Sequence, residues 1–261
     1  KSLTVSANGV SKVYDGNLSM TNLSLVLSGQ VSGSDVVNVA GIGTYANKNV
    51  SGAADKAYTL SNLAISGADS GNYVLTNGVT LSPITTQAGS NGEVTPRPLT
   101  ITFTGVDKVY DGTALANVTT ADNRVAGDVF TINRTSLYAT PDVAWSGSTV
   151  VDKAITLSNV TLSNPAGVST VDAGNYSVVV DPLAVASKVT PKLVTAALIG
   201  NIQKTYDGND SATLAAANFQ LTGFVAGQGA TVTRTVGTYN SPYVLLANSV
   251  TTSLAASDFT A

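Results

Sequence analysis

One five-residue motif recurs three times at a constant spacing, and this recurrence constrains the fold more than any other feature of the chain. The motif spans Lys12–Gly16, Lys108–Gly112 and Lys204–Gly208, and each copy ends in Tyr-Asp-Gly. The tyrosines of successive copies are 96 residues apart in both intervals. A motif that returns at a fixed period over such a distance indicates duplicated structural units. The chain of 261 residues is therefore predicted to hold three tandem repeats, at residues 1–95, 96–190 and 191–261.

Two further motifs occur in both of the first two repeats. Residues 55–65 match residues 152–162, and the apolar alternation in each copy changes phase, at Ser61-Asn62 and at Ser158-Asn159. A strand that changes phase in this way needs a bulge, so we expect one at each of these positions. The other motif is Gly-Asn-Tyr, at residues 71–73 and again at residues 174–176.

The third repeat is shorter than the period and lacks the Gly-Asn-Tyr motif. We expect it to be truncated at its C-terminal end and to show an unpaired sheet edge, poor order or a strand borrowed from a neighbour. Its segment Leu214–Phe219 contains three successive alanines, which favours a short helical turn.

Short apolar runs separated by glycine, serine and asparagine recur along the chain, a pattern typical of strands joined by turns. Asn77-Gly78, between residues 74–76 and 79–81, predicts a hairpin. The predicted fold class is all-β, and each repeat is expected to be an Ig-like antiparallel sandwich; a β-grasp-like unit with a short helix is the alternative. Proline follows Val-Thr at both repeat junctions and makes the connectors stiff, so we expect an extended rod of about 120 Å.

The Tyr-Asp-Gly motif has two interpretations. In the first, Asp and Gly shape a turn while the tyrosine ring is buried; in the second, the Asp belongs to a ligand or calcium loop, such as residues 69–72 or 207–210. Presence in every repeat favours the structural role, so no metal and no cofactor are predicted. A Lys-to-Asn isopeptide bond at Lys12 and its equivalents is a further alternative. The residues assigned to the repeated signatures are Tyr14, Asp15, Gly16, Tyr110, Asp111, Gly112, Tyr206, Asp207, Gly208, Asn72, Tyr73, Asn175 and Tyr176.

Composition narrows the classes of function. Charged residues make up 11% of the chain and the net charge is −3, so there is no basic surface to neutralise phosphates and nucleic acid is not an expected partner. No run approaches the roughly 18 apolar residues of a membrane span. The chain contains no histidine and no cysteine, which removes the commonest general base and thiol nucleophile. We therefore expect a protein that is neither an enzyme nor inserted in a membrane.

Two aromatic residues of the second repeat are candidate ligand contacts. Trp145, the single tryptophan, and Tyr138 lie in a polar segment that also holds Pro141. An aromatic ring on a polar loop can stack on a sugar, whereas the alternative is a role in the core. The second interpretation is the commoner one for a single aromatic residue.

The three Lys-x-Tyr-Asp-Gly motifs, the Gly-Asn-Tyr motifs and the Val-Thr-Pro junctions resemble the YDG/MBG-type repeats of very large bacterial secreted proteins. These include filamentous-haemagglutinin-like adhesins exported by two-partner secretion. The resemblance covers nearly the whole chain. It implies an extracellular, cell-surface stalk that supports biofilm formation or host attachment, with further repeats of the same polypeptide at both ends and no catalytic residues.

Two hypotheses about function follow. In the first, the chain is a structural spacer that projects an adhesive tip. In the second, one or more repeats bind a polysaccharide or a cell-surface partner directly, as a surface rich in Asn, Ser and Thr with occasional aromatics would allow. Exposed aromatic rings in a groove favour the second hypothesis, and buried aromatic rings favour the first.

Overall fold

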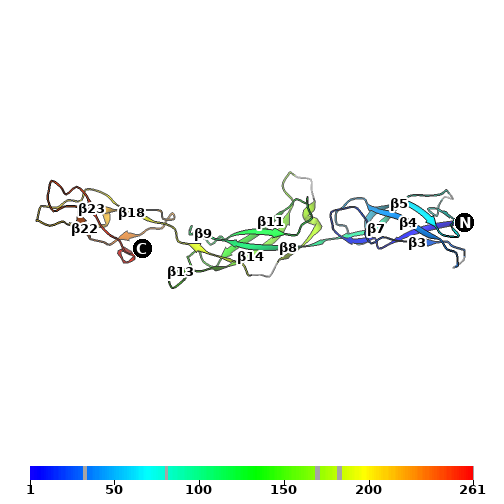
Figure 1. Cartoon of the computed structure of the whole chain (residues 1–261), viewed down its shortest axis with the longest axis horizontal. Coiled ribbons are helices and arrows are strands. Elements are labelled where there is room, and N and C mark those ends of the chain that lie inside the picture. The colour runs from blue at the N-terminus through cyan, green and yellow to red at the C-terminus, as the bar shows by residue number, and fades with distance from the viewer. Residues whose placement is uncertain (32–33, 80–81, 168–170, 181–183, 261) are drawn as a thin grey trace. The chain divides into compact units, whose positions relative to one another are not determined.

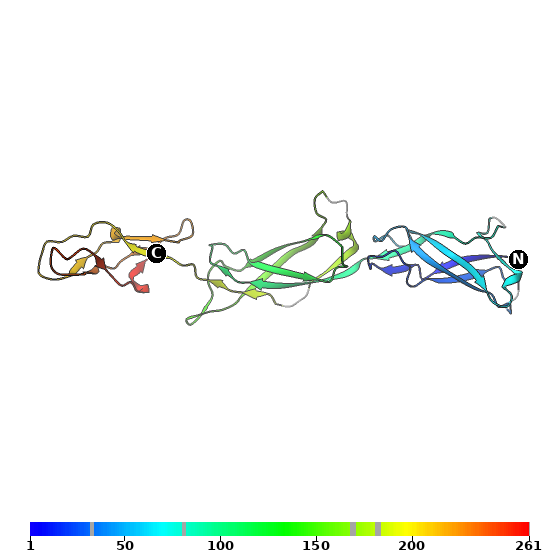
Figure 2. The same cartoon turned by 45° about the horizontal axis from the view of Figure 1, so that its top comes forward.

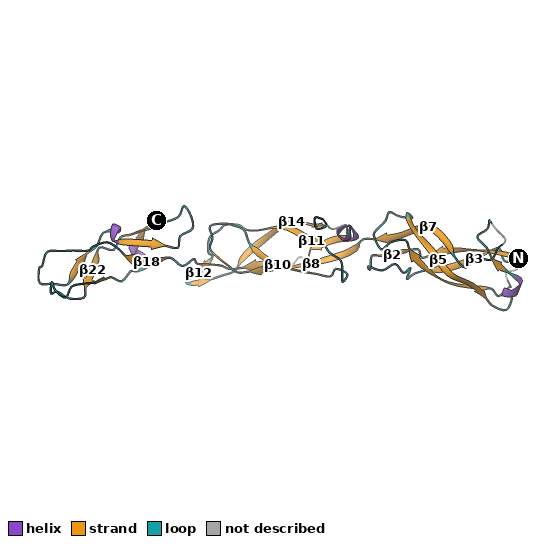
Figure 3. Cartoon of the chain, turned by 90° about the horizontal axis from the view of Figure 1, so that it is seen from above, coloured by secondary structure: helices purple, strands orange, loops and turns teal. Residues whose placement is uncertain are grey.

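A computed structural model of the chain describes residues 1–31, 34–79, 82–167, 171–180 and 184–260 (Figure 1). The described part consists of short strands and four 3-10 turns, which are purple in Figure 3. The all-β class predicted from the sequence is confirmed. No helix in these ranges is long and apolar enough to cross a membrane.

The elements follow one another in this order. The strands of residues 1–95 are β1 (Ser2–Asn8), β2 (Ser11–Val13), β3 (Ser24–Ser28), β4 (Asn38–Tyr45), β5 (Lys56–Ser66), β6 (Val74–Leu75) and β7 (Gln87–Thr95). Those of residues 96–190 are β8 (Arg97–Val106), β9 (Lys108–Val109), β10 (Asn117–Asp122), β11 (Thr131–Tyr138), β12 (Trp145–Ser146), β13 (Thr149–Val150), β14 (Lys153–Ser163), β15 (Tyr176–Val180), β16 (Ala186–Ser187) and β17 (Val189–Thr190). The last are β18 (Thr195–Leu198), β19 (Ser211–Thr213), β20 (Phe219–Thr222), β21 (Thr231–Val232), β22 (Val236–Tyr239), β23 (Val250–Thr251) and β24 (Phe259–Thr260), and the 3-10 turns are η1 (Ser70–Asn72), η2 (Asp172–Asn175), η3 (Ala216–Asn218) and η4 (Ala256–Asp258).

The chain forms two compact units. The first comprises Lys1–Thr104, Val118–Ser136 and Leu157–Ala184, and the second comprises Gly105–Asn117, Leu137–Thr156 and Val185–Ala261. The repeat boundaries at 95 and 190 stay a prediction from the sequence.

The first unit contains a four-stranded sheet in the order β2-β7-β5-β4, labelled in part in Figure 1 and seen from another side in Figure 2. A second sheet has the order β3-β1-β6. Alternate side chains of these strands are buried, as the period-two pattern predicts. Leu3 on β1, Leu60 on β5 and Val94 on β7 are each at most 1% exposed.

The strand pairing is mixed, which corrects the antiparallel sandwich expected from the sequence. The early strands of the first two repeats pair in parallel with late ones: β1 with β6, β2 with β7, β8 with β15, and β9 with β17. A parallel pair cannot be joined by a tight hairpin and needs a long intervening segment. Local turn signals in the sequence therefore could not reveal these pairs.

The bulge predicted at Ser61-Asn62 is confirmed. The register of β4 and β5 shifts between Ala40 and Ile42, opposite the Ser61-Asn62 step. Asn62 adopts φ 52°, and its equivalent Asn159 adopts φ 54°. Asparagine is the residue after glycine that tolerates this left-handed conformation best, because its short amide can bond locally.

Two local predictions have different outcomes. The helical turn expected in Leu214–Phe219 is present as η3. At the expected hairpin, Gly78 has φ 78° and the Val79 N–H donates to Asn77 Oδ1 at 2.9 Å. The second strand of that hairpin includes residues 80–81, which lie outside the described residues.

The last segment forms small sheets only. Within residues 192–260 the sheets are β18-β20, β19-β22-β23 and β21-β24, all antiparallel. In this range β18 has no parallel partner of the kind that β1 has in β6 and β8 has in β15. Open sheets with free edges also occur in the first two repeats, so the unpaired edge expected from truncation of the third repeat stays a prediction.

Candidate functional site

The Tyr-Asp-Gly turn of the first repeat is shaped by Lys12, which lies just before it. Lys12 Nζ donates to Asp15 Oδ1 at 2.7 Å, to the Asn17 carbonyl at 2.8 Å and to the Ser19 carbonyl at 3.0 Å. The ammonium also lies 5.5 Å from the centre of the Tyr45 ring. Because Lys12 is only 6% exposed, this buried charge needs all of these partners. The network fixes the path of residues 12–19.

The other two copies repeat the arrangement. Lys108 pairs with Asp111 at 2.8 Å, and Lys204 pairs with Asp207 at 2.7 Å. The Lys108 hydrogen bond is the main reason that the pKa of Asp111 falls to about 2. Lys12 Nζ also lies 3.1 Å from Asn17 Oδ1 and Lys204 Nζ lies 2.6 Å from Asn209 Oδ1, so the isopeptide bond considered from the sequence stays a prediction.

Gly16 allows the turn of the first repeat to approach the second. Its φ is 81°, and a Cβ atom placed there would lie 2.6 Å from Cγ1 of Val125. Only glycine satisfies both conditions, since another residue would be strained and would collide. We refer to Tyr14, Asp15 and Gly16 as the docking turn.

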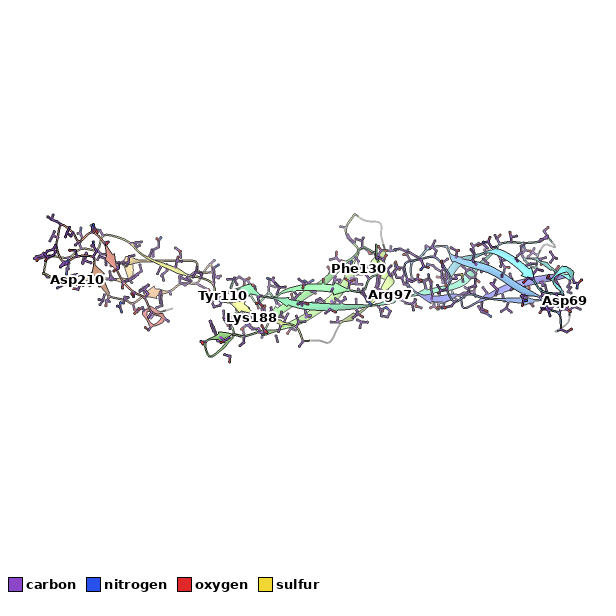
Figure 4. The ribbon with its side chains drawn as sticks, in the orientation of Figure 1. Asp69, Arg97, Tyr110, Phe130, Lys188 and Asp210 are labelled. Carbon is purple, nitrogen blue, oxygen red and sulfur yellow. The ribbon has the colours of Figure 1, made fainter. Side chains whose placement is uncertain are left out.

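Tyr14 is 1% exposed and points its hydroxyl at a carboxylate of the second repeat. This hydroxyl donates to Asp128, at 2.8 Å from Oδ2. Tyr176 donates to the same oxygen at 2.6 Å, and its ring meets the Tyr14 ring edge-on with 5.5 Å between centres. The ring of Phe130, labelled in Figure 4, packs against the ring of Tyr176 with 5.1 Å between their centres. These residues all belong to the first unit.

Lys48 of the first repeat completes the network. Its Nζ lies 2.7 Å from Asp128 and 3.2 Å from Asp172. Asp172 also accepts the Val129 N–H at 3.1 Å. The two aspartate side chains are 1% and 6% exposed, so Lys48 supplies the positive charge that their burial requires.

Asn175 of the Gly-Asn-Tyr motif bonds to the first repeat as well. It is 1% exposed, and its Oδ1 accepts the Val50 N–H at 2.9 Å. Its Nδ2 donates to Asn49 Oδ1 at 3.1 Å. We define the receiving site as the set of second-repeat residues that contact the docking turn or residues 48–50 of the first repeat. These are Val125, Asp128, Asp172, Asn175 and Tyr176.

The electrostatics follow from this network. Burial by itself raises the pKa of the Asp128 carboxyl, but hydrogen bonds from Lys48, Tyr176 and Tyr14 outweigh it and hold the pKa below its ordinary value. Burial lowers the pKa of Lys48, but the hydrogen bond to Asp128 raises it, and the net result is a raised pKa. Burial and the bond to Asp128 raise the pKa of Tyr176. At neutral pH Asp128 is therefore a carboxylate, Lys48 an ammonium, and Tyr14 and Tyr176 neutral phenols.

The second copy of the turn has different partners, within the second unit. Tyr110 accepts a hydrogen bond from Gln228 Nε2 at 2.5 Å, and a Cβ atom on Gly112 would lie 3.0 Å from Val225. Val225 and Gln228 thus take the places of Val125 and Asp128. Each pair is joined by the same turn bond, from the N–H of the fourth residue to the carbonyl of the first.

The third copy and the first Gly-Asn-Tyr motif are more exposed. Tyr206 is 61% exposed, and no atom lies within 4 Å of a Cβ placed on Gly208. Asn72 lies in η1, where its carbonyl accepts the N-terminal ammonium at 2.9 Å. The Tyr73 hydroxyl donates to Asp35 and accepts the Val31 N–H.

The two candidate ligand contacts are not brought together. Trp145, on the β12–β13 hairpin opposite Val150, is 54% exposed. Tyr138 is 3% exposed, and its hydroxyl lies 2.6 Å from Ser187 Oγ. Tyr138 therefore belongs to the core and is removed from the ligand contacts predicted from the sequence.

No group of three or more carboxylates in the described ranges is placed to hold a metal ion. The Asp128 and Asp172 carboxylates that do converge share the Lys48 ammonium. The arrangement is a polar contact between residues of the first and second repeats.

Lys48, Asp128 and Asp172 are not among the residues predicted from the sequence. A signal was present: Val-Ala-Gly occurs at residues 125–127 and 225–227, as well as at 39–41, and an aspartate precedes Gly-Asn-Tyr by two residues in both copies. Each of these motifs is too short to be recognised until its contacts are known.

A family model described as the YDG domain matches residues 1–81 and again residues 95–184, together more than half of the chain. The chain belongs to the YDG domain family. Each matched YDG segment carries one Tyr-Asp-Gly motif and one Gly-Asn-Tyr motif. No curated protein and no solved structure matches the chain.

We expect Tyr14→Phe to destabilise the protein and the identical change at Tyr206 to have little effect. Tyr14→Phe removes a hydrogen bond to a buried carboxylate, which should lower the free energy of unfolding by about 1.5–3 kcal/mol. Tyr206→Phe alters an exposed side chain and should stay within about 0.5 kcal/mol of the parent. Equilibrium urea unfolding followed by circular dichroism measures both. Equal effects of the two substitutions would contradict the role assigned to Tyr14.

Stability should depend on pH through Asp128. Because its pKa is lower in the folded state, its contribution is present above the unfolded pKa of about 3.9 and is lost as the pH falls through the folded value. Asp128→Asn should therefore lower the free energy of unfolding at pH 7. The difference in stability between the variant and the parent protein should become smaller as the pH falls. Urea midpoints measured from pH 7 down to pH 2.5 test this. A difference that stays constant over the series would contradict the assignment.

Proposed function

We propose that this chain is a stalk or spacer segment of a large extracellular bacterial adhesin, projecting an adhesive tip for biofilm formation or host attachment. Its first two YDG repeats contact one another through tyrosine, lysine and aspartate side chains that bond to each other. The resemblance to repeats of adhesins exported by two-partner secretion supports placing it at the bacterial cell surface or in the secreted fraction.

The observation that carries the proposal is the parallel pairing of early and late strands. In the first repeat β2 pairs in parallel with β7, with Ser11, Lys12 and Val13 opposite Glu93, Val94 and Thr95. A force that pulls a repeat from its two ends draws such strands past each other along their length. The hydrogen bonds between them then share the load instead of opening one at a time.

The second repeat repeats this arrangement. Its β8 pairs in parallel with β15 over five residue pairs, and β9 pairs with β17. Two YDG repeats that oppose tension in the same way suit a segment that transmits force between a cell and an attached tip.

A second candidate function is direct binding of polysaccharide by the chain as an adhesive module. It is favoured by one observation, the 54% exposure of Trp145. An exposed indole is a surface on which a sugar ring can stack.

The force required to unfold the first repeat should depend on the direction of pulling. Because the chain has no cysteine, handles can be attached at introduced pairs. Lys1→Cys with Pro96→Cys loads the parallel strands in shear. In the second pair, Asn38→Cys and Ser66→Cys face each other at one end of the antiparallel β4–β5 pair. Pulling on these two positions opens the hydrogen bonds between β4 and β5 one at a time. We expect a higher unfolding force for the first pair in single-molecule pulling. An equal or lower force would remove the mechanical support for a spacer.

The adhesive alternative is tested by binding of the purified chain to a panel of bacterial and host polysaccharides, with Trp145→Ala measured in parallel. The spacer function predicts no saturable binding by either protein. Saturable binding that Trp145→Ala abolishes would show a sugar site on the β12–β13 hairpin and would favour the second candidate.

A further inference from the structure

The first repeat carries its own version of the receiving site, built from the same hydrogen bonds. The Val31 N–H donates to the Tyr73 hydroxyl at 3.0 Å, and that hydroxyl donates to Asp35. The Val36 N–H donates to Asp69 Oδ2 at 2.8 Å. Figure 4 labels Asp69, which precedes η1.

In the second repeat the corresponding bonds run as follows. The Val125 N–H donates to Tyr176 at 2.8 Å, Tyr176 donates to Asp128 at 2.6 Å, and the Val129 N–H donates to Asp172 at 3.1 Å. The first receiving site is accordingly formed by Val31, Asp35, Asp69, Asn72 and Tyr73.

The two receiving sites differ in what covers them. In the second repeat Asp128, Asp172 and Asn175 are 6%, 4% and 1% exposed, because the docking turn and the Lys48 segment lie over them. In the first repeat Val31 is 72% exposed, and Asn72 is exposed as well. Asp35, Asp69 and Tyr73 are half-buried, so the first site has the internal hydrogen bonds of the second site with less cover.

The charges of the first site are also unmatched. Within the described ranges, neither Asp35 nor Asp69 lies within ion-pair distance of a lysine or arginine. Their counterparts Asp128 and Asp172 share Lys48. An occupant that buries Asp35 and Asp69 must therefore bring a cation, because burying two carboxylates without one is strongly unfavourable.

The turn of the second repeat indicates which occupant fits. Lys48 stands three residues after the buried Tyr45, and the residue three after the buried Tyr138 is Pro141. The Tyr-Asp-Gly turn of the second repeat has no lysine at the position of Lys48. Its Tyr110 contacts the uncharged Gln228, which takes the place of Asp128. The turn accompanied by Lys48 thus meets Asp128, and the turn accompanied by Pro141 meets the uncharged Gln228.

We propose that Val31, Asp35, Asp69, Asn72 and Tyr73 form a docking site for the Tyr-Asp-Gly turn of another YDG repeat that carries a lysine at the position of Lys48. The inference deepens the proposed function, on which it rests only for the presence of a neighbouring repeat. Residues 1–96 of this chain have the required turn and lysine, so a copy of them serves as the probe.

The test is an extended protein in which a second copy of residues 1–96 is fused before Lys1 of the full chain. The added copy carries Asn49→Cys and the original copy carries Asn72→Cys. The reference pair is Asn49→Cys with Asn175→Cys in the unextended chain, because those two side chains are 3.1 Å apart. We expect disulfide formation in the extended protein under mild oxidation, read from gel mobility and a tryptic digest.

Two variants separate docking from mere tethering. Tyr14→Phe with Lys48→Gln, in the added copy only, leaves the tether unchanged and should slow disulfide formation roughly tenfold or more, since it removes charge-assisted bonds. Asp35→Asn with Asp69→Asn, in the original copy, should slow it similarly. These aspartates are half-buried, and circular dichroism of the unextended chain checks that their replacement leaves the fold intact.

Disulfide formation at the same rate in the parent and in both variants would overturn the proposal. So would its absence in the extended protein when the reference pair forms its disulfide. Neither result bears on the pulling or polysaccharide experiments, so a failure of the docking site is distinguishable from a failure of the spacer function.

Discussion

A buried carboxylate shared by two phenols and an ammonium is the interaction on which the contact between the first two YDG repeats depends. Asp128 is placed by its own repeat, through Tyr176, and is neutralised by the other, through Tyr14 and Lys48. Removing one partner leaves a charge in a site from which water is excluded, which costs more than a surface ion pair would. The contact is therefore specific in geometry, whereas a purely apolar contact would tolerate sliding.

The same backbone turn is used three times with three different surroundings. Lysine and aspartate residues fix its shape in every copy, as the ion pairs of Lys12, Lys108 and Lys204 show. The residues that meet the turn vary from Asp128 to Gln228, and Tyr206 remains largely exposed. A constant turn with variable partners lets a repetitive chain discriminate between neighbours by charge without altering the fold of the repeat.

In the first two repeats, parallel pairs join early strands to late ones. The parallel pairs β2–β7 and β9–β17 lie immediately before the docking turns, and Tyr14 and Tyr110 extend them by donating their N–H groups to Thr95 and Thr190. The parallel pair within a repeat and the turn that contacts the next repeat are thus continuous in sequence. In the proposed spacer, force would pass from one to the other through a few residues.

The sequence by itself determined the repetition, the all-β class, the bulge at Asn62, and the structural role of Tyr-Asp-Gly as a turn. These features depend on local patterns of period, turn chemistry and backbone conformation. The parallel pairs, the burial of Tyr138 and the meeting of Tyr14 with Asp128 were decided only by the tertiary structure. Residues 14 and 128 are far apart in the chain, and a lone aspartate or lysine carries no mark of its partner until folding brings the two together and excludes water.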